Sequence, residues 1–179
     1  LGTGDTNNIG IFLNTNSTGT IPSGGSLTPS VEVSGNNSTG VLVSGGSSLT
    51  LGGTVKATGN AVTGIVANNT TVTLSGTGGV TVNNGTNAAG KATVSSAEKG
   101  SYGIVVKGSS GNFTGTDTTV TANVTTDKSV GLYSEGTLKI KQADIKTSDG
   151  AINFYSKGGN IEVTNGGTTE TGQKSLLFY

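Results

Sequence analysis

The chain of 179 residues contains no cysteine, histidine, methionine, tryptophan or arginine. Without cysteine it cannot use disulfides, the common staple of extracellular β-rich proteins, and it suits export as an unfolded thread. Without histidine it lacks the usual general base and the commonest metal ligand. Ten lysines balance ten acidic residues, so the formal net charge is zero. A nucleic-acid-binding protein is therefore not expected, because phosphate contacts need a net basic face.

Hydrophobic residues are also scarce, at 31%, and aromatic residues make up 4%. A thick globular core is excluded, since about 45–50% apolar residues are usual there. No apolar run approaches the ~18 residues of a membrane-spanning helix. No signal peptide is visible at Leu1, and the chain stops inside a strand-like run at Tyr179, so we expect a piece of a longer protein. Disorder is disfavoured because there are only two prolines and the apolar residues form short β-branched clusters.

What the chain does contain is glycine, 32 residues of it, and a recurring phrase. The phrase is a small residue followed by three mostly apolar ones. Successive copies are spaced by 30, 24, 39, 28, 20 and 24 residues. Such a period indicates a stacked architecture in which each repeat is one rung. The copies start at Gly10, Gly40, Gly64, Gly103, Gly131, Ala151 and Ser175.

Each rung is expected to hold three short strands. In the clearest one, residues 130–134, 137–141 and 143–146 have strand patterns, and 148–150 have turn chemistry. Three short strands per ~24-residue turn are typical of a parallel β-helix rather than a propeller blade. The sequence thus predicts an all-β chain, a single parallel β-helix segment over residues 1–179 with about six to seven rungs.

Two connections are long enough to leave the body of the rod as loops, at about residues 14–30 and 83–101. Loops of this kind often carry binding specificity, although a tolerated, solvated insertion without function is the simpler explanation. The second connection supplies a candidate binding loop, formed by Lys91, Glu98, Lys99 and Tyr102.

Side-chain alternation assigns faces to the phrase. The second and fourth residues of each copy are expected to point inward, and the third outward. The first, small residue is also expected to point outward, which would leave a shallow groove. The outward column is nevertheless mostly apolar and would form a stripe ~30 Å long. We interpret it as a candidate binding face, or as a surface covered by a loop, a flanking segment or a second chain. Its members are Phe12, Leu42, Val66, Val105, Tyr133 and Leu177, with Asn153 as a polar interruption.

Catalytic patterns are poor. β-Helical pectin-cleaving enzymes use clustered acids, whereas the nearest pair here is Asp144 with Asp149, and Asp149 is an ordinary turn residue. No phosphate-binding loop and no calcium-binding nonapeptide is present. We therefore predict no catalytic residue, no metal site and no cofactor. Thr71-Val72-Thr73 and Thr119-Val120-Thr121 could project threonines as ice-binding β-helices do, but the pattern does not recur rung after rung, so ice binding is not expected.

The segment 129–136, Ser-Val-Gly-Leu-Tyr-Ser-Glu-Gly, resembles a phrase repeated in the passengers of large fusobacterial type V autotransporter adhesins. Residues 157–165 resemble the strand that follows it in that family. The resemblance is clearest over residues 100–179. It implies a right-handed β-helix on the surface of a Gram-negative bacterium, tethered by a C-terminal outer-membrane domain outside this chain.

The same resemblance implies adhesion to a host receptor or glycan, or to another bacterium, with no membrane insertion of this segment. The matched motif is a scaffold signature, so it transfers no binding residue. Two alternatives stay open: a polysaccharide-active β-helical enzyme and an inert spacer stalk.

Overall fold

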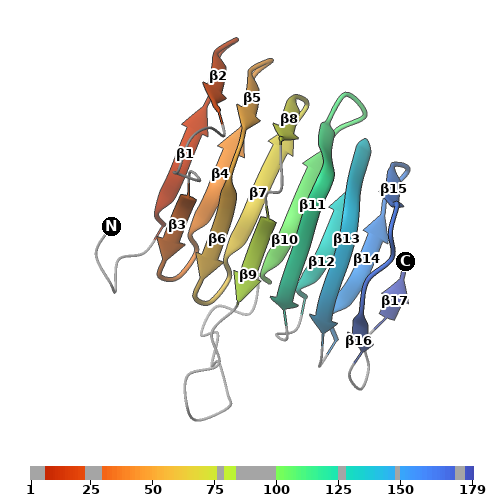
Figure 1. Ribbon diagram of the computed structural model, residues 1–179. Coiled ribbons are helices and arrows are strands. Elements are labelled where there is room, and N and C mark those ends of the chain that lie inside the picture. Colours follow the sequence, from red (N-terminus) through yellow and green to blue (C-terminus); the bar gives the residue numbers. More distant parts are fainter. Residues whose placement is uncertain are drawn as a thin grey trace.

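In the computed structural model, the described residues are 7–22, 30–75, 79–83, 100–124, 128–147, 150–171 and 176–179, and they form two facing parallel sheets (Figure 1). Sheet A has seven strands: β1 (Ile9–Leu13), β4 (Thr39–Val43), β7 (Thr63–Asn68), β10 (Tyr102–Lys107), β12 (Val130–Ser134), β14 (Ile152–Ser156) and β17 (Leu176–Phe178). Sheet B has ten: β2 (Thr18–Ile21), β3 (Ser30–Ser34), β5 (Ser48–Leu51), β6 (Thr54–Thr58), β8 (Thr71–Leu74), β9 (Gly79–Asn83), β11 (Asn112–Val124), β13 (Thr137–Thr147), β15 (Asn160–Val163) and β16 (Thr169–Thr171).

The chain passes alternately between the sheets, and each strand pairs in parallel with its counterpart one turn away. Val41, for example, lies opposite Ile11 on one side and Ile65 on the other. The all-β class and the parallel stacking of short strands are thus confirmed. The described residues include no helix, so none that could cross a membrane.

Three strands per turn is correct for the first three turns and for the sixth, where sheet B receives two short strands each time. In the fourth and fifth turns the prediction is wrong, because the single strands β11 and β13 each extend over both of these positions in sheet B. Their pairing is irregular only between Gly115 and Thr119. The predicted loop at 14–30 is also partly wrong, since it contains β2; residues 23–29 of it lie outside the described part of the chain.

The core is narrow and lies between the sheets. The second residue of the phrase faces inward as predicted in the central turns, where Val41, Ile65, Ile104 and Leu132 are 0% exposed. Phe113 of β11 packs against them from sheet B and is equally buried. This explains how so few apolar residues suffice, because each turn buries only a few side chains.

The small first residue faces inward, which corrects the predicted outward groove. A Cβ on Gly40 would lie 2.5 Å from the Val55 Cγ1 atom in the core and 2.6 Å from the carbonyl oxygen of Gly64 in the next turn. Gly10 and Gly131 are crowded in the same way. The small residue and the apolar residue after it, such as Gly40 and Val41, therefore both face inward. The strict alternation of inward and outward side chains is interrupted at these two positions.

The last two copies of the phrase were placed two residues too early. Leu132 lies opposite Phe154, and Tyr133 lies opposite Tyr155, an offset of 22 rather than 20 residues. Asn153 consequently occupies the column of the small residue, with 0% exposure. The predicted inward residues Ile152 and Leu176 pair with each other outside the core, where Leu176 is exposed.

Asn153 can occupy this inward position because the polar atoms of its side chain form hydrogen bonds inside the fold. Its Oδ1 atom accepts a 2.5 Å hydrogen bond from the Thr147 hydroxyl, and its Nδ2 atom donates one of 3.4 Å to the Ile145 carbonyl oxygen. A buried amide with such partners is compatible with a core position. Polarity alone therefore indicated the wrong face for this residue.

Candidate binding face

The outer surface of sheet A carries two columns of side chains, which we call the outer face. The first is the predicted column in its corrected register: Phe12, Leu42, Val66, Val105, Tyr133, Tyr155 and Tyr179. The second precedes the small residue of each turn: Ile9, Thr39, Thr63, Tyr102, Val130, Ile152 and Leu176.

All four tyrosines of the chain belong to the outer face. Three of them form a ladder on consecutive turns. The ring centroids of Tyr133 and Tyr155 are 5.2 Å apart and those of Tyr155 and Tyr179 are 4.9 Å apart, with ring planes at 87° in both pairs. Edge-to-face geometry is a favourable arrangement for neighbouring aromatic rings. The ladder therefore holds its rings in defined orientations.

A polar clamp fixes the first ring of the ladder. The Tyr133 hydroxyl donates a 2.5 Å hydrogen bond to Oε1 of Glu135, and Oε2 accepts one of 2.8 Å from the backbone N–H of Gly108. Lys157 lies 3.5 Å from the same carboxylate. Together the Tyr133 hydrogen bond, the Gly108 N–H and Lys157 lower the pKa of Glu135. Burial and then Glu135 itself raise the pKa of Tyr133.

Exposure varies along the outer face. Phe12 is 56% exposed and Tyr179 is 69% exposed, whereas Leu42, Val66 and Tyr155 are half-buried. Val105 faces outward as predicted but is only 5% exposed, so it offers a partner little contact surface.

Leu177 stands opposite Asn153 in the inward column rather than on the outer face, and it is 41% exposed. It lines an apolar cavity of about 350 Å³ between the sheets at the last turn, with Phe154, Ile161, Val163 and Phe178. Of the candidate loop, Lys91, Glu98 and Lys99 lie outside the described residues. Tyr102 begins β10 and belongs to the outer face.

Acid–base chemistry finds little support among the described side chains. Asp144 accepts 2.9 Å hydrogen bonds from the backbone N–H and the hydroxyl of Thr168, and a 2.8 Å bond from Gln142. These bonds lower its pKa, which suits a structural carboxylate rather than a proton donor. Its suggested partner Asp149 lies outside the described residues, and within them no group of three acidic residues could hold a metal ion.

A feature missed from the sequence lies on the opposite surface. The outward residues of β2, β5, β8 and the start of β11 stand in register, turn after turn. The aligned pairs are Thr18 with Thr20, Ser48 with Thr50, Thr71 with Thr73, and Asn112 with Thr114, so Thr-x-Thr itself occurs in two of these four turns and does not recur in every turn. Unequal spacings along the chain concealed the alignment, which only the strand register reveals.

The outer face offers aromatic rings, aliphatic side chains and phenol hydroxyls on one sheet, and contiguous exposed apolar patches often mark interaction surfaces. No family model, no curated protein and no solved structure matches this chain.

Proposed function

We propose that this chain is a segment of a bacterial cell-surface adhesin that binds a host surface protein or glycan, or another bacterium, through the outer face. The observation that carries the proposal is the gathering of all four tyrosines with Phe12, Leu42 and Val66 on a surface that the core does not need.

The finer fold proposed with it is a right-handed parallel β-helix. Parallel ladders that link each turn to the next support this architecture, and right-handed crossovers dominate parallel sheets. The resemblance of residues 129–136 to autotransporter passengers supports the same fold and a location on the outside of a Gram-negative cell.

Physical reasons connect this face with binding. Removing apolar surface from water contributes about 25 cal/mol per Å², and a solvated sheet face is usually polar. Tyrosine adds a large rigid contact surface with few rotatable bonds, which limits the entropy lost on binding. The Glu135 clamp restricts Tyr133 further before any partner arrives.

The test measures adhesion of the purified chain to cultured host cells and to other bacteria. A double variant, Leu42→Lys with Tyr155→Lys, places two charges on the outer face and should abolish adhesion. The matched control is Thr81→Lys with Thr121→Lys, two exposed positions on neighbouring turns of sheet B. Circular dichroism and thermal unfolding verify that both variants remain folded.

Undiminished adhesion of the folded Leu42/Tyr155 variant would overturn the proposal. To separate binding from spacing, the region is replaced in its parent protein by an unrelated rod of equal length. Retained adhesion in that experiment would support the spacer alternative instead.

A further inference from the structure

The turn between β15 and β16 contains the dipeptide Asn165-Gly166. The sequence contains Asn-Gly twice, and only this copy lies among the described residues, because residues 84 and 85 are outside them. An asparagine side chain followed by glycine can react with the backbone of its own chain, since glycine has no Cβ to obstruct the approach of the two groups. The surroundings of the turn decide whether this reaction is open to Asn165.

Both reacting groups of the dipeptide are accessible. Asn165 and Gly166 are exposed, and a Cβ placed on Gly166 would meet no atom within 4 Å. Gly166 has a φ of 74°, which glycine adopts at no steric cost. Within the described ranges of the chain, neither the side-chain amide of Asn165 nor the backbone N–H of Gly166 has a hydrogen-bond partner. The amide carbon and the nitrogen that can attack it are therefore both unshielded.

Other asparagines near the turns lack this freedom. The backbone N–H of Ser17, which follows Asn16, donates to a serine hydroxyl of the next turn at 2.9 Å. The backbone N–H of Asn69, which follows Asn68, donates to the carbonyl oxygen of Lys107, also at 2.9 Å. A nitrogen held in such a bond must lose it before it can attack the preceding side chain. These asparagines are consequently internal references for Asn165.

We propose that Asn165 deamidates spontaneously by cyclising onto Gly166. The deprotonated backbone nitrogen of Gly166 attacks Cγ of Asn165, the new N–Cγ bond closes a succinimide ring, and the Cγ–Nδ2 bond breaks. The leaving group takes up the lost proton and departs as ammonia. Water then opens the ring: addition at Cγ gives aspartate, and addition at the main-chain carbonyl carbon gives isoaspartate, in which the chain runs through Cγ. Water is the only co-reactant.

The backbone of the turn is tightly tied to β13. The Asn165 N–H donates to the carbonyl oxygen of Lys141 at 2.8 Å, and the Ala143 N–H donates to the carbonyl oxygen of Gly166 at 3.1 Å. Gly167 lies so close to β13 that an added Cβ would overlap the carbonyl oxygen of Ala143. A change in backbone length at Asn165 is therefore transmitted directly to the contact between the fifth and sixth turns.

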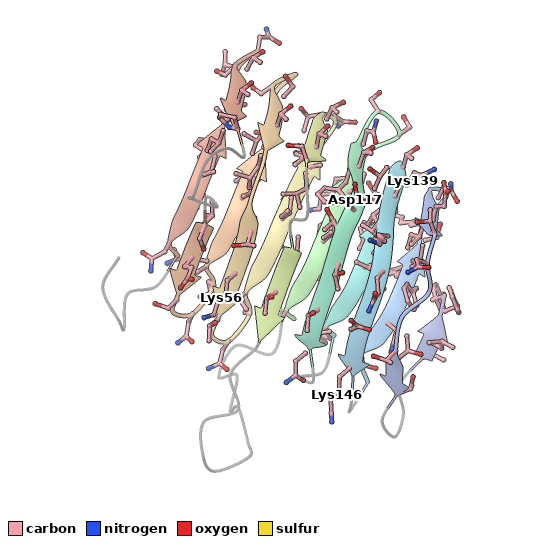
Figure 2. All side chains as sticks on the ribbon, in the orientation of Figure 1. Lys56, Asp117, Lys139 and Lys146 are labelled. Atoms are coloured by element: carbon pink, nitrogen blue, oxygen red, sulfur yellow. The ribbon has the colours of Figure 1, made fainter. Side chains whose placement is uncertain are left out.

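The isoaspartate product lengthens the main chain by one methylene group immediately before this contact. The turn lies against the part of β13 between Lys139 and Lys146, which are labelled in Figure 2. β16 follows the turn and pairs with β13 over only 3 residues, so it is the element that loses its register. The aspartate product keeps the normal backbone and adds only a charge. The inference does not depend on the adhesin proposal, because it concerns the chemistry of the turn alone.

The test incubates the purified chain in neutral buffer at body temperature for several weeks and maps its peptides by mass spectrometry at intervals. Asn165 should convert to aspartate and isoaspartate several-fold faster than Asn16 or Asn68. Asn165→Gln is the control, because a glutamine side chain would have to close a larger ring, and it should stay an amide. Peptide mapping assigns each event to its residue, so the Asn-Gly at residues 84 and 85 is counted separately. An intact Asn165, or one that converts no faster than Asn16 and Asn68, would overturn the proposal.

Hydrogen exchange tests the structural effect on the isoaspartate form, after chromatographic separation from the unaged and aspartate forms. The N–H groups of Ala143 and Ile145 donate to carbonyl oxygens of the turn, at residues 166 and 168, and should exchange several-fold faster in the isoaspartate form. Asn165→Asp adds the same charge on the normal backbone and should leave their exchange unchanged. Equal exchange in the unaged and isoaspartate forms, or an equal increase in the Asn165→Asp variant, would overturn the loosening of β16 by the longer backbone.

Discussion

The hydroxyl of Tyr133 donates a 2.5 Å hydrogen bond to the carboxylate of Glu135, which lies two residues further along the chain. The bond links the tyrosine ladder of the outer face to the backbone of the preceding turn at Gly108 and to Lys157 of the following turn. Ring orientation on the candidate binding face is therefore coupled to the stacking of three consecutive turns.

This clamp makes stability depend on pH at both ends of the scale. Because the pKa of Glu135 is lowered in the folded chain, its carboxylate stabilises the fold at pH values above 4.5, the ordinary pKa of this group. That contribution is lost as the pH falls through the lowered pKa. The raised pKa of Tyr133 gives a contribution to the stability of the fold that is complete at pH values below 10.0, the ordinary pKa of this group, and declines at higher pH. Urea unfolding across the pH range should show both losses.

Glu135→Gln should flatten the acid limb of that profile, and Tyr133→Phe should lower the free energy of unfolding by about 1–2 kcal/mol near neutrality. Glu162→Gln is the control, since its carboxylate is exposed on sheet B. An acid limb unchanged by Glu135→Gln would show that the clamp does not control it.

Gly40→Ala should be destabilising by about 1–3 kcal/mol, because the new Cβ would meet Val55 and the carbonyl oxygen of Gly64 at 2.5 and 2.6 Å. Chemical denaturation measures the change. Gly79→Ala is the control; its Cβ would meet only the Thr119 carbonyl oxygen, at an ordinary 3.5 Å. Equal effects at the two positions would contradict the inward assignment of the glycine column.

Thr147→Val should lower the free energy of unfolding by about 1–3 kcal/mol, since it removes the hydroxyl that donates to the buried Asn153 amide. Thr121→Val changes the same atoms at an exposed position of sheet B and should be nearly neutral. Thermal unfolding of the two variants compares them directly. A neutral Thr147→Val would mean that Asn153 finds another donor.

Phe113→Ala should cost about 3–5 kcal/mol, because it empties a fully buried site in the core between the two sheets. Phe12→Ala removes the same side chain from an exposed position on the outer face and should change stability by less than about 1 kcal/mol. Unfolding in denaturant distinguishes them, and comparable losses would contradict the assignment of Phe113 to the core.

The repeat was predictable because its central copies obey simple rules. From Gly40 to Gly131, apolar residues follow the small residue at inward positions, and Val41, Ile65, Ile104 and Leu132 are buried as expected. The candidate binding face was predicted in part, since Phe12, Leu42, Val66 and Tyr133 do point outward. Tyr155 and Tyr179 were missed because the copies after Gly131 were aligned by composition.

Composition by itself determined that this chain is built of stacked β-strands: too few apolar residues for a thick core, many glycines, and a phrase repeated every turn. Only the tertiary structure decided the register. Whether Asn153 or Tyr155 faces the core depends on hydrogen-bond partners that lie in other strands, and the alignment of Thr20 with Thr50 and Thr73 depends on loops of unequal length. A slip of one residue reverses every side chain of a strand, so contacts between turns, rather than the local sequence, determine which residues share a face.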